Sequence, residues 1–498
     1  MRKVINTQMQ IGETDISNVG IDIRSRDEIP RLLLGLQFIY SQPNIRNTIF
    51  KLLKQIIPDG VNPNNGCPGM DLWKIFVLGA IRLICNWDYD KVHDIANNHK
   101  TIRQMLGHGV VDDDYHYALQ TIKDNVSLFT LSVLDEISQV VVQAGHSFLN
   151  SDQLDSLKTR CDSFVLETDV HYPTDINLLF DAIRKAITLI ARVSSTAGQT
   201  SWRQSKHNIR TIKKLFNKVR KLKRSTSNNP KKKAEKEQQI IRAHQKYIEL
   251  VLFYLKKIET TLNTIRIENF IEYLKIQEIE KYIIHAYRQI DQIYRRVVLG
   301  ETIPHHEKVF SIFEEHTEWI SKGKAGVPQE LGLRVCILED QFGFIVHHHV
   351  MEKQTDDQVA VTMVESARQK FPNITSCSFD KGFYTPANRT ELRKILEKVI
   401  LPKKGRLSHQ DKELEHSEQF IASKKQHSAV ESAIHSLENH GLDRCLDHGI
   451  DGFKRYVALA VLARNIEKLG SLIQKKQLKR LKRKEKRSQI TAPHRLAA

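Results

Sequence analysis

The change of hydrophobic period after Pro328 constrains the fold of this chain more than any other feature. Apolar residues stand at every second position from Leu331 to Ile337, a short turn follows at residues 340–343, and residues 344–350 return as a second extended run. Two extended runs joined by a short turn predict a β-hairpin. The long stretch before it, residues 177–298, has helical periodicity. The chain therefore combines helices with a sheet.

Strands and helices alternate after this hairpin. Helices are expected over residues 355–371 and 386–396 and from about residue 426, and strands over residues 374–379 and 399–401. An earlier strand is expected over residues 159–167. Without the helical stretch after that first strand, the order is three antiparallel strands followed by alternating helices and strands. This is the order of a ribonuclease H-like α/β core, a mixed five-stranded sheet with helices.

These segments predict a chain of several domains. An all-α N-terminal domain spans residues 1–150, and its short helices with polar turns resemble a DNA-binding domain. The first core strand region is 151–176, and a basic helical insert, a hairpin or coiled coil, is 177–300. The remainder of the core is 301–470, and a basic tail is 471–498.

Three acidic residues stand where strands or helices could bring them together: Asp162 in the first strand, Asp380 at the end of strand 374–379, and Glu431 in a late helix. Gathered carboxylates bind hard divalent cations, and a pair of such cations supports in-line attack at a phosphodiester. Taken singly, each acid is explained as well by a turn, a cap or a solvated helix face. Their matching positions in the predicted fold favour a shared site.

Asp169 is the alternative first acid. It lies seven residues after Asp162, and an odd separation places two side chains on opposite faces of a regular strand. Only one of the two is therefore expected to reach a common site. We favour Asp162 and expect Asp169 to act in the following turn.

The formal net charge of +18 favours a polyanionic partner, most simply nucleic acid. Two regions concentrate the basic residues. The tail, residues 475–487, is expected either to contact phosphates or to be a solvated, disordered segment. The insert is expected to contact phosphates through Lys213, Lys214, Lys218, Arg220, Lys221, Lys223 and Arg224.

The sequence shows no signal peptide, no membrane span and no paired cysteine motif. We therefore expect a cytoplasmic protein with no membrane partner.

Several local motifs resemble those of bacterial insertion-sequence DDE transposases, and the likeness is nearest to the group filed as "not classified yet" (ISNCY). Residues 162–175 resemble the first-aspartate signature, and residues 380–389 are similar to the second, an Asp-Lys-Gly-aromatic turn. Residues 430–434, leading to residues 441–445, resemble the third. Residues 318–326 resemble a stretch that precedes the second strand in this group.

The resemblance implies that Asp162, Asp380 and Glu431 are the catalytic residues and hold two Mg²⁺ ions, with Mn²⁺ as a substitute. The implied activity is cleavage and strand transfer of DNA. The implied partners are the element's terminal inverted repeats and target DNA, bound by a homodimer in the synaptic complex of a nucleoid-associated bacterial protein. Two other classes stay open: a ribonuclease H-like nuclease that cuts without joining, and a catalytically silent DNA-binding protein.

The residues around Glu431 depart from the related pattern. Relatives often carry Tyr and Arg seven and four residues before the catalytic Glu and Lys seven after it, whereas this chain has Lys424, His427 and Glu438. Phosphate contact needs mainly a positive or hydrogen-bonding group. We expect His427 or Lys425 to supply it, with Lys381 and Lys424 as further DNA contacts.

Overall fold

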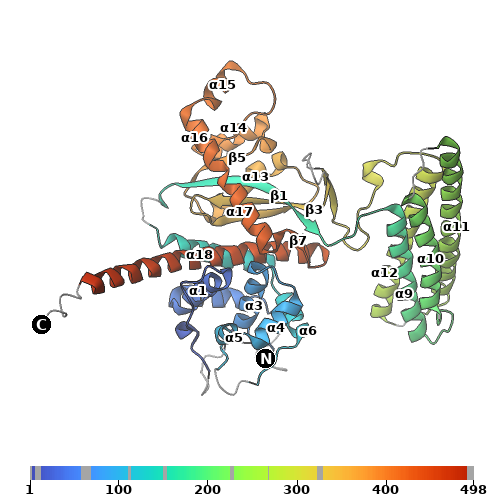
Figure 1. The fold of residues 1–498 in the computed structure, drawn as a ribbon, viewed down its shortest axis with the longest axis horizontal. Helices are drawn as coiled ribbons and strands as arrows, with labels where there is room; N and C mark the ends of the chain where they lie inside the picture. Colours follow the sequence, from blue (N-terminus) through green and yellow to red (C-terminus); the bar gives the residue numbers. More distant parts are fainter. Residues whose placement is uncertain are drawn as a thin grey trace. The chain divides into compact units, whose positions relative to one another are not determined.

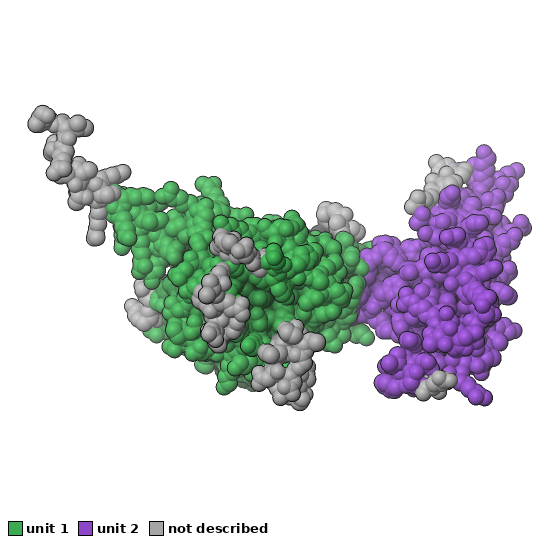
Figure 2. Space-filling view, turned by 90° about the horizontal axis from the view of Figure 1, so that it is seen from below, with its two compact units in different colours: residues 1–169, 318–498 green, residues 170–317 purple. Residues whose placement is uncertain are grey.

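The structure is a computed structural model (Figure 1). It describes residues 3–5, 13–57, 69–109, 114–149, 154–224, 229–266, 269–321 and 329–490, without the side chains of Arg224 and residues 487–490. The chain divides into two compact units (Figure 2). Unit 1 comprises residues 1–169 and 318–498, and unit 2 comprises residues 170–317.

The sheet of unit 1 is mixed. Five of its strands follow the order β4-β3-β1-β5-β6, in which β1 is antiparallel to β3 and parallel to β5. The expected mixed sheet with helices is confirmed, but the described residues form seven strands instead of five, since β2 also pairs with β3 and β7 also pairs with β1. The strands are β1 (Leu157–Thr168), β2 (Glu318–Ser321), β3 (Gln329–Asp340), β4 (Ile345–Met351), β5 (Ile374–Phe379), β6 (Lys398–Ile400) and β7 (Arg444–Cys445).

Helices surround this sheet and share one hydrophobic core with it. The N-terminal helices are α1 (Glu28–Ser41), α2 (Pro43–Lys54), α3 (Leu72–Ile84), α4 (Tyr89–Asn98), α5 (Lys100–Met105), α6 (Leu119–Val126) and α7 (Leu131–His146). The later helices are α13 (Asp356–Lys370), α14 (Pro386–Ile395), α15 (His409–Glu415), α16 (Glu418–His427), α17 (Ala429–Leu437) and α18 (Gly449–Ile490). The N-terminal helices thus belong to the compact unit of the sheet.

The long helix α18 lies between the N-terminal helices and the sheet (Figure 1). Its close approach to α1 depends on glycine, because a Cβ at Gly470 would lie 1.7 Å from the carbonyl oxygen of Arg31. A Cβ at Gly35 would likewise lie 2.3 Å from the carbonyl oxygen of Ile466. The two backbones are therefore in direct contact. Of the segment expected as a separate basic tail, residues 471–490 continue this helix, and residues 491–498 lie outside the described residues.

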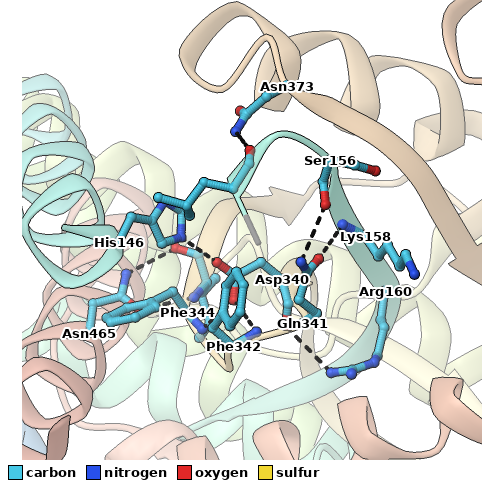
Figure 3. A network of polar contacts seen from close by, with 12 residues as sticks. His146, Ser156, Lys158, Arg160, Asp340, Gln341, Phe342, Phe344, Asn373 and Asn465 are labelled. Atoms are coloured by element: carbon cyan, nitrogen blue, oxygen red, sulfur yellow. Dashed lines mark hydrogen bonds and ion pairs between the residues drawn. The ribbon is translucent and has the colours of Figure 1, made fainter. Parts of the chain in front are cut away.

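A buried polar network joins α7, the β3–β4 turn and α18 (Figure 3). Asp340 is fully buried and accepts hydrogen bonds from the backbone amides of Phe342 and Phe344 at 2.8 and 2.9 Å. Its second carboxylate oxygen lies 2.7 Å from Nε2 of His146. Asn465 of α18 bonds both backbone groups of Ile345. These contacts fix the hairpin against helices from both ends of the chain.

The described residues of unit 2 form a bundle of four helices with a core of its own, not the two-helix hairpin or coiled coil that the sequence suggested. The helices are α9 (Asp175–Thr196), α10 (Ser205–Arg224), α11 (Pro230–Leu262) and α12 (Phe270–Ile293). The turn after α9 separates it from α10: Gly198 has a φ of +71°, and Trp202 is buried and donates to the hydroxyl of Thr261. The apolar stripe of α12 packs mainly on α9. The core of unit 2 therefore includes α9 in addition to the helices expected for a hairpin.

Among the described residues, no single helix is long and apolar enough to cross a membrane, and only the bent pair of α6 and α7 passes such a test together.

Candidate active site

The pairing of β1 with β5 brings Asp162 and Asp380 next to each other. The two strands are parallel, and their register pairs Arg160 with Ser378 and Cys161 with Phe379. Asp162 is the next residue of β1 and Asp380 directly follows the end of β5, so this register extended by one residue sets Asp162 beside Asp380. Directly paired residues point to the same face of a sheet, and neighbouring strands lie about 4.8 Å apart. The two carboxylates therefore share one face.

Glu431 reaches the same place from α17, which packs on β1. The pKa of Asp162 is raised to about 6, mainly by burial and also by the negative charges of Asp380, Asp356 and Glu431, against a hydrogen bond from the Ser163 amide that lowers it. Each of these three charges therefore lies near Asp162. The structure thus gathers the three acids expected from the sequence and adds a fourth.

Asp356, the fourth acid, is not apparent from the sequence, because the Thr-Asp-Asp stretch at residues 355–357 has the composition of an N-terminal cap for the helix expected over residues 355–371. The cap is present at the start of α13. However, Asp356 Oδ1 also accepts a hydrogen bond of 2.6 Å from the hydroxyl of Ser163, the residue after Asp162. Its Oδ2 would lie 3.1 Å from a Cβ at Gly382. Asp356 thus connects the first strand with the turn that carries Asp380, a contact between distant segments that no local pattern reveals.

Asp380 begins the turn that follows β5. The turn is a short 3-10 helix, Lys381–Phe383, in which Phe383 is buried and its amide donates to the backbone carbonyl of Asp380 at 3.2 Å. Asp380 itself is exposed, as is Lys381. Buried Phe383 therefore fixes the turn to the core and leaves Asp380 and Lys381 at the surface.

His427 lies within this cluster. Its Nδ1 is 3.0 Å from the hydroxyl of Ser378, which is paired with Arg160 on β1. Burial lowers the pKa of His427, while the charges of Asp380 and Glu431 oppose that shift and the charge of Arg160 adds to it. The neutral imidazole is therefore favoured. His427 touches the strand that leads to Asp380.

Lys424 and Lys425 lie in the last turn of α16 with exposed side chains. The basic residues expected to contact DNA from the insert lie on α10, in unit 2, and those with described side chains are exposed: Lys213, Lys214, Lys218, Arg220, Lys221 and Lys223. The side chain of Arg224 lies outside the described residues.

Asp169 is placed apart from the cluster. It follows the last residue of β1, is exposed, and its Oδ1 lies 3.6 Å from Nη1 of Arg444. Seven residues of extended chain span about 23 Å, so its carboxylate lies far along the strand from Asp162. Arg444 also bonds Glu167. These contacts are those of a strand end.

The chemistry of the donor set suits a hard divalent cation, because all four groups are carboxylates. In their present side-chain positions, the described residues hold no group of three or more His, Cys, Asp or Glu that could hold a metal ion. Two observations nevertheless fit a cation: the carboxylates share a small region, and their mutual repulsion contributes to the raised pKa of Asp162. A cation between them would remove that repulsion.

Comparison with known proteins agrees with this geometry. Residues 300–466 match the family model of the transposase DDE domain. The matched segment covers about a third of the chain and includes Asp380 and Glu431 but not Asp162. The match supports a DDE transposase family and a DNA-acting enzyme. No curated protein and no solved structure matches the chain.

Proposed function

We propose that the chain is a DDE transposase that cleaves DNA at the ends of an insertion sequence and transfers the freed strand to target DNA. The observation that carries this proposal is the parallel register that sets Asp162 beside Asp380, with the charge of Glu431 near Asp162. The strand order β4-β3-β1-β5-β6 supports a ribonuclease H-like core. By resemblance, the element is of the ISNCY type.

In this proposal Asp162, Asp380 and Glu431 hold two divalent ions, Mg²⁺ or Mn²⁺. Such a pair supplies an activated water and stabilises the leaving 3′ oxygen. The chain's own part is to hold ionised carboxylates close together and to orient the scissile phosphate. Because burial disfavours the charged form of Asp162, its ionisation depends on nearby positive charge more than that of an exposed acid does.

Basic residues around the acids support DNA as the substrate. Lys381 lies in the turn that Asp380 begins. The basic residues Lys424, Lys425 and His427 lie at the end of α16, four to seven residues before Glu431. In unit 2, α10 carries nine basic residues and no acidic one. Such helices bind phosphates through charge without reading sequence. We propose that α10 contacts the phosphate backbone of the DNA at the terminal repeats, in a synaptic homodimer.

A strand-transfer assay with a labelled DNA end and a plasmid target tests the proposal. Asp162→Asn, Asp380→Asn and Glu431→Gln should each abolish cleavage and joining in Mg²⁺ and in Mn²⁺, with DNA binding retained. Asp169→Asn is the matched control and should stay active. The first-strand assignment is wrong if Asp162→Asn is active and Asp169→Asn is not.

The same assay separates the other two classes. Cleavage without joining in the unmodified protein would indicate a nuclease. Binding without cleavage, under every divalent ion tested, would indicate a catalytically silent DNA-binding protein.

A further inference from the structure

The end of α18 is a basic helix that extends beyond the body of unit 1 (Figure 1). Between residues 475 and 486 there are eight basic residues and one acidic residue, and none of these twelve residues is buried. The last buried positions of the helix are Ile473 and Gln474. This segment therefore contributes little to the core.

Contacts with the N-terminal segment fix the orientation of this end. The side-chain amide of Gln474 donates to the carbonyl oxygens of Ile23 and Ser25 at 3.0 and 2.9 Å. Further along, Glu485 Oε1 lies 3.4 Å from Nη2 of Arg24. The side of the helix that bears Glu485 therefore faces the N-terminal segment at residues 23–25.

Helical spacing separates two sides of this segment. At 3.6 residues per turn, Leu478, Leu481 and Glu485 lie on one line, and both leucines are half-buried. The row Lys475, Lys479, Lys482 and Lys486, spaced four, three and four apart, lies about a quarter turn away. All four lysines are exposed and form no ion pair with a described residue. The row is about 17 Å long.

We propose that the row Lys475–Lys479–Lys482–Lys486 is a binding surface for the phosphate backbone of duplex DNA, separate from the candidate active site. Four unpaired lysines on a straight, anchored line match a polyanion with regularly spaced charges. A membrane surface fits less well, because the apolar side has only two leucines and no aromatic residue. This inference takes DNA as the partner from the proposed function. It does not depend on the proposed cleavage and strand transfer.

Binding of the full chain to a 40-base-pair duplex of arbitrary sequence, in EDTA and over a range of salt, tests this surface. The variant carries Gln at Lys475, Lys479, Lys482 and Lys486, because Gln preserves helix propensity. Each lost phosphate contact removes about 0.9 from the slope of log affinity against log salt. The slope should therefore flatten by about 2 to 4, with roughly tenfold weaker binding at low salt.

A control variant with Gln at four scattered exposed lysines, Lys246, Lys256, Lys275 and Lys394, removes the same charge. It should change the slope by less than about 1. Equal changes of the salt slope in the two variants would overturn the assignment. It would also be overturned if the variant at Lys475, Lys479, Lys482 and Lys486 lost binding to anionic lipid vesicles but bound DNA as the unmodified protein does. If the row binds DNA but the protein transfers no strand, the proposed function fails and this inference stands.

Discussion

Asp162 of β1 lies beside Asp380, the residue that directly follows β5, because the register of these parallel strands pairs Cys161 with Phe379. Like charges placed so close, one of them half-buried, are unfavourable unless one is protonated or a cation lies between them. In a folded protein such an arrangement costs stability, and it persists where function requires it. The following predictions use that cost as a measurable signal.

Asp162→Asn should stabilise the metal-free protein near pH 8. The pKa of Asp162 is raised from 3.8 to about 6 in the folded state, so the folded state binds more protons than the unfolded state between these values. Stability is thus lost as pH rises from about 4 to about 6 and is not regained above that. A shift of about two units corresponds to about 3 kcal/mol at most.

Thermal unfolding in EDTA at pH 4 and pH 8 checks this prediction. The gain in Tm should appear at pH 8 and vanish at pH 4. Asp169→Asn, at an exposed carboxylate, should leave Tm unchanged at both values. A gain that is equal at pH 4 and pH 8 would contradict the electrostatic origin.

Mg²⁺ or Mn²⁺ should raise the Tm of the unmodified protein, and the effect should weaken below about pH 6 as Asp162 becomes protonated. An ion at a hundred times its Kd contributes about 2.7 kcal/mol. Asp380→Asn should lose the effect, whereas Asp169→Asn should keep it. Differential scanning fluorimetry with titrated metal is sufficient, and an equal shift in both variants would exclude Asp380 as a ligand.

Asp356 should act as a positioning residue. Asp356→Asn keeps an acceptor for the hydroxyl of Ser163 but removes a charge that raises the pKa of Asp162. The acid limb of the pH profile for strand cleavage should therefore move to lower pH. A purely structural role would lower the rate without moving that limb.

Asp357→Asn is the matched control, because it changes the next residue at the same helix start and is not among the charges that act on Asp162. Its pH profile should be unchanged. Ser163→Ala should alter the rate of cleavage, and combining it with Asp356→Asn should give less than the sum of the two effects, since the two residues share one contact.

The sequence predicted those parts of the fold that depend on local pattern. The alternation from Leu331 to Ile337 predicted the hairpin of β3 and β4, and the order of segments predicted the mixed sheet. The fourth acid could not be predicted in this way. Asp356 approaches Ser163 and Gly382 only through tertiary packing, and its local sequence is that of an ordinary helix cap.

The sequence predicted a helical hairpin for the insert because the packing between helices is not visible in a local pattern. The apolar stripe of α12 is visible in the sequence, but a stripe does not state which helix covers it. Here α9 packs on α12 and α11 packs with α10. The tail was ambiguous because charge runs are compatible with helix and with disorder alike. Continuity with the buried part of α18 is a property of the folded chain.

The last prediction concerns the buried pair of His146 and Asp340. Removing one partner of a buried hydrogen-bonded pair leaves the other without compensation and costs about 3 to 5 kcal/mol. We expect His146→Ala to cause a loss of this order, measured as the free energy of unfolding in urea. Asp340→Asn should cost less, because an amide oxygen can still accept from Phe342 and Phe344. Since the pair joins α7 to the β3–β4 turn (Figure 3), both variants should lower the unfolding midpoint of unit 1.

A control substitution at an exposed ion pair, Lys91→Ala beside Asp94, should cost less than about 1 kcal/mol. If Lys91→Ala lowered the free energy of unfolding as much as His146→Ala does, the buried pair of His146 and Asp340 would contribute no more to stability than an exposed pair.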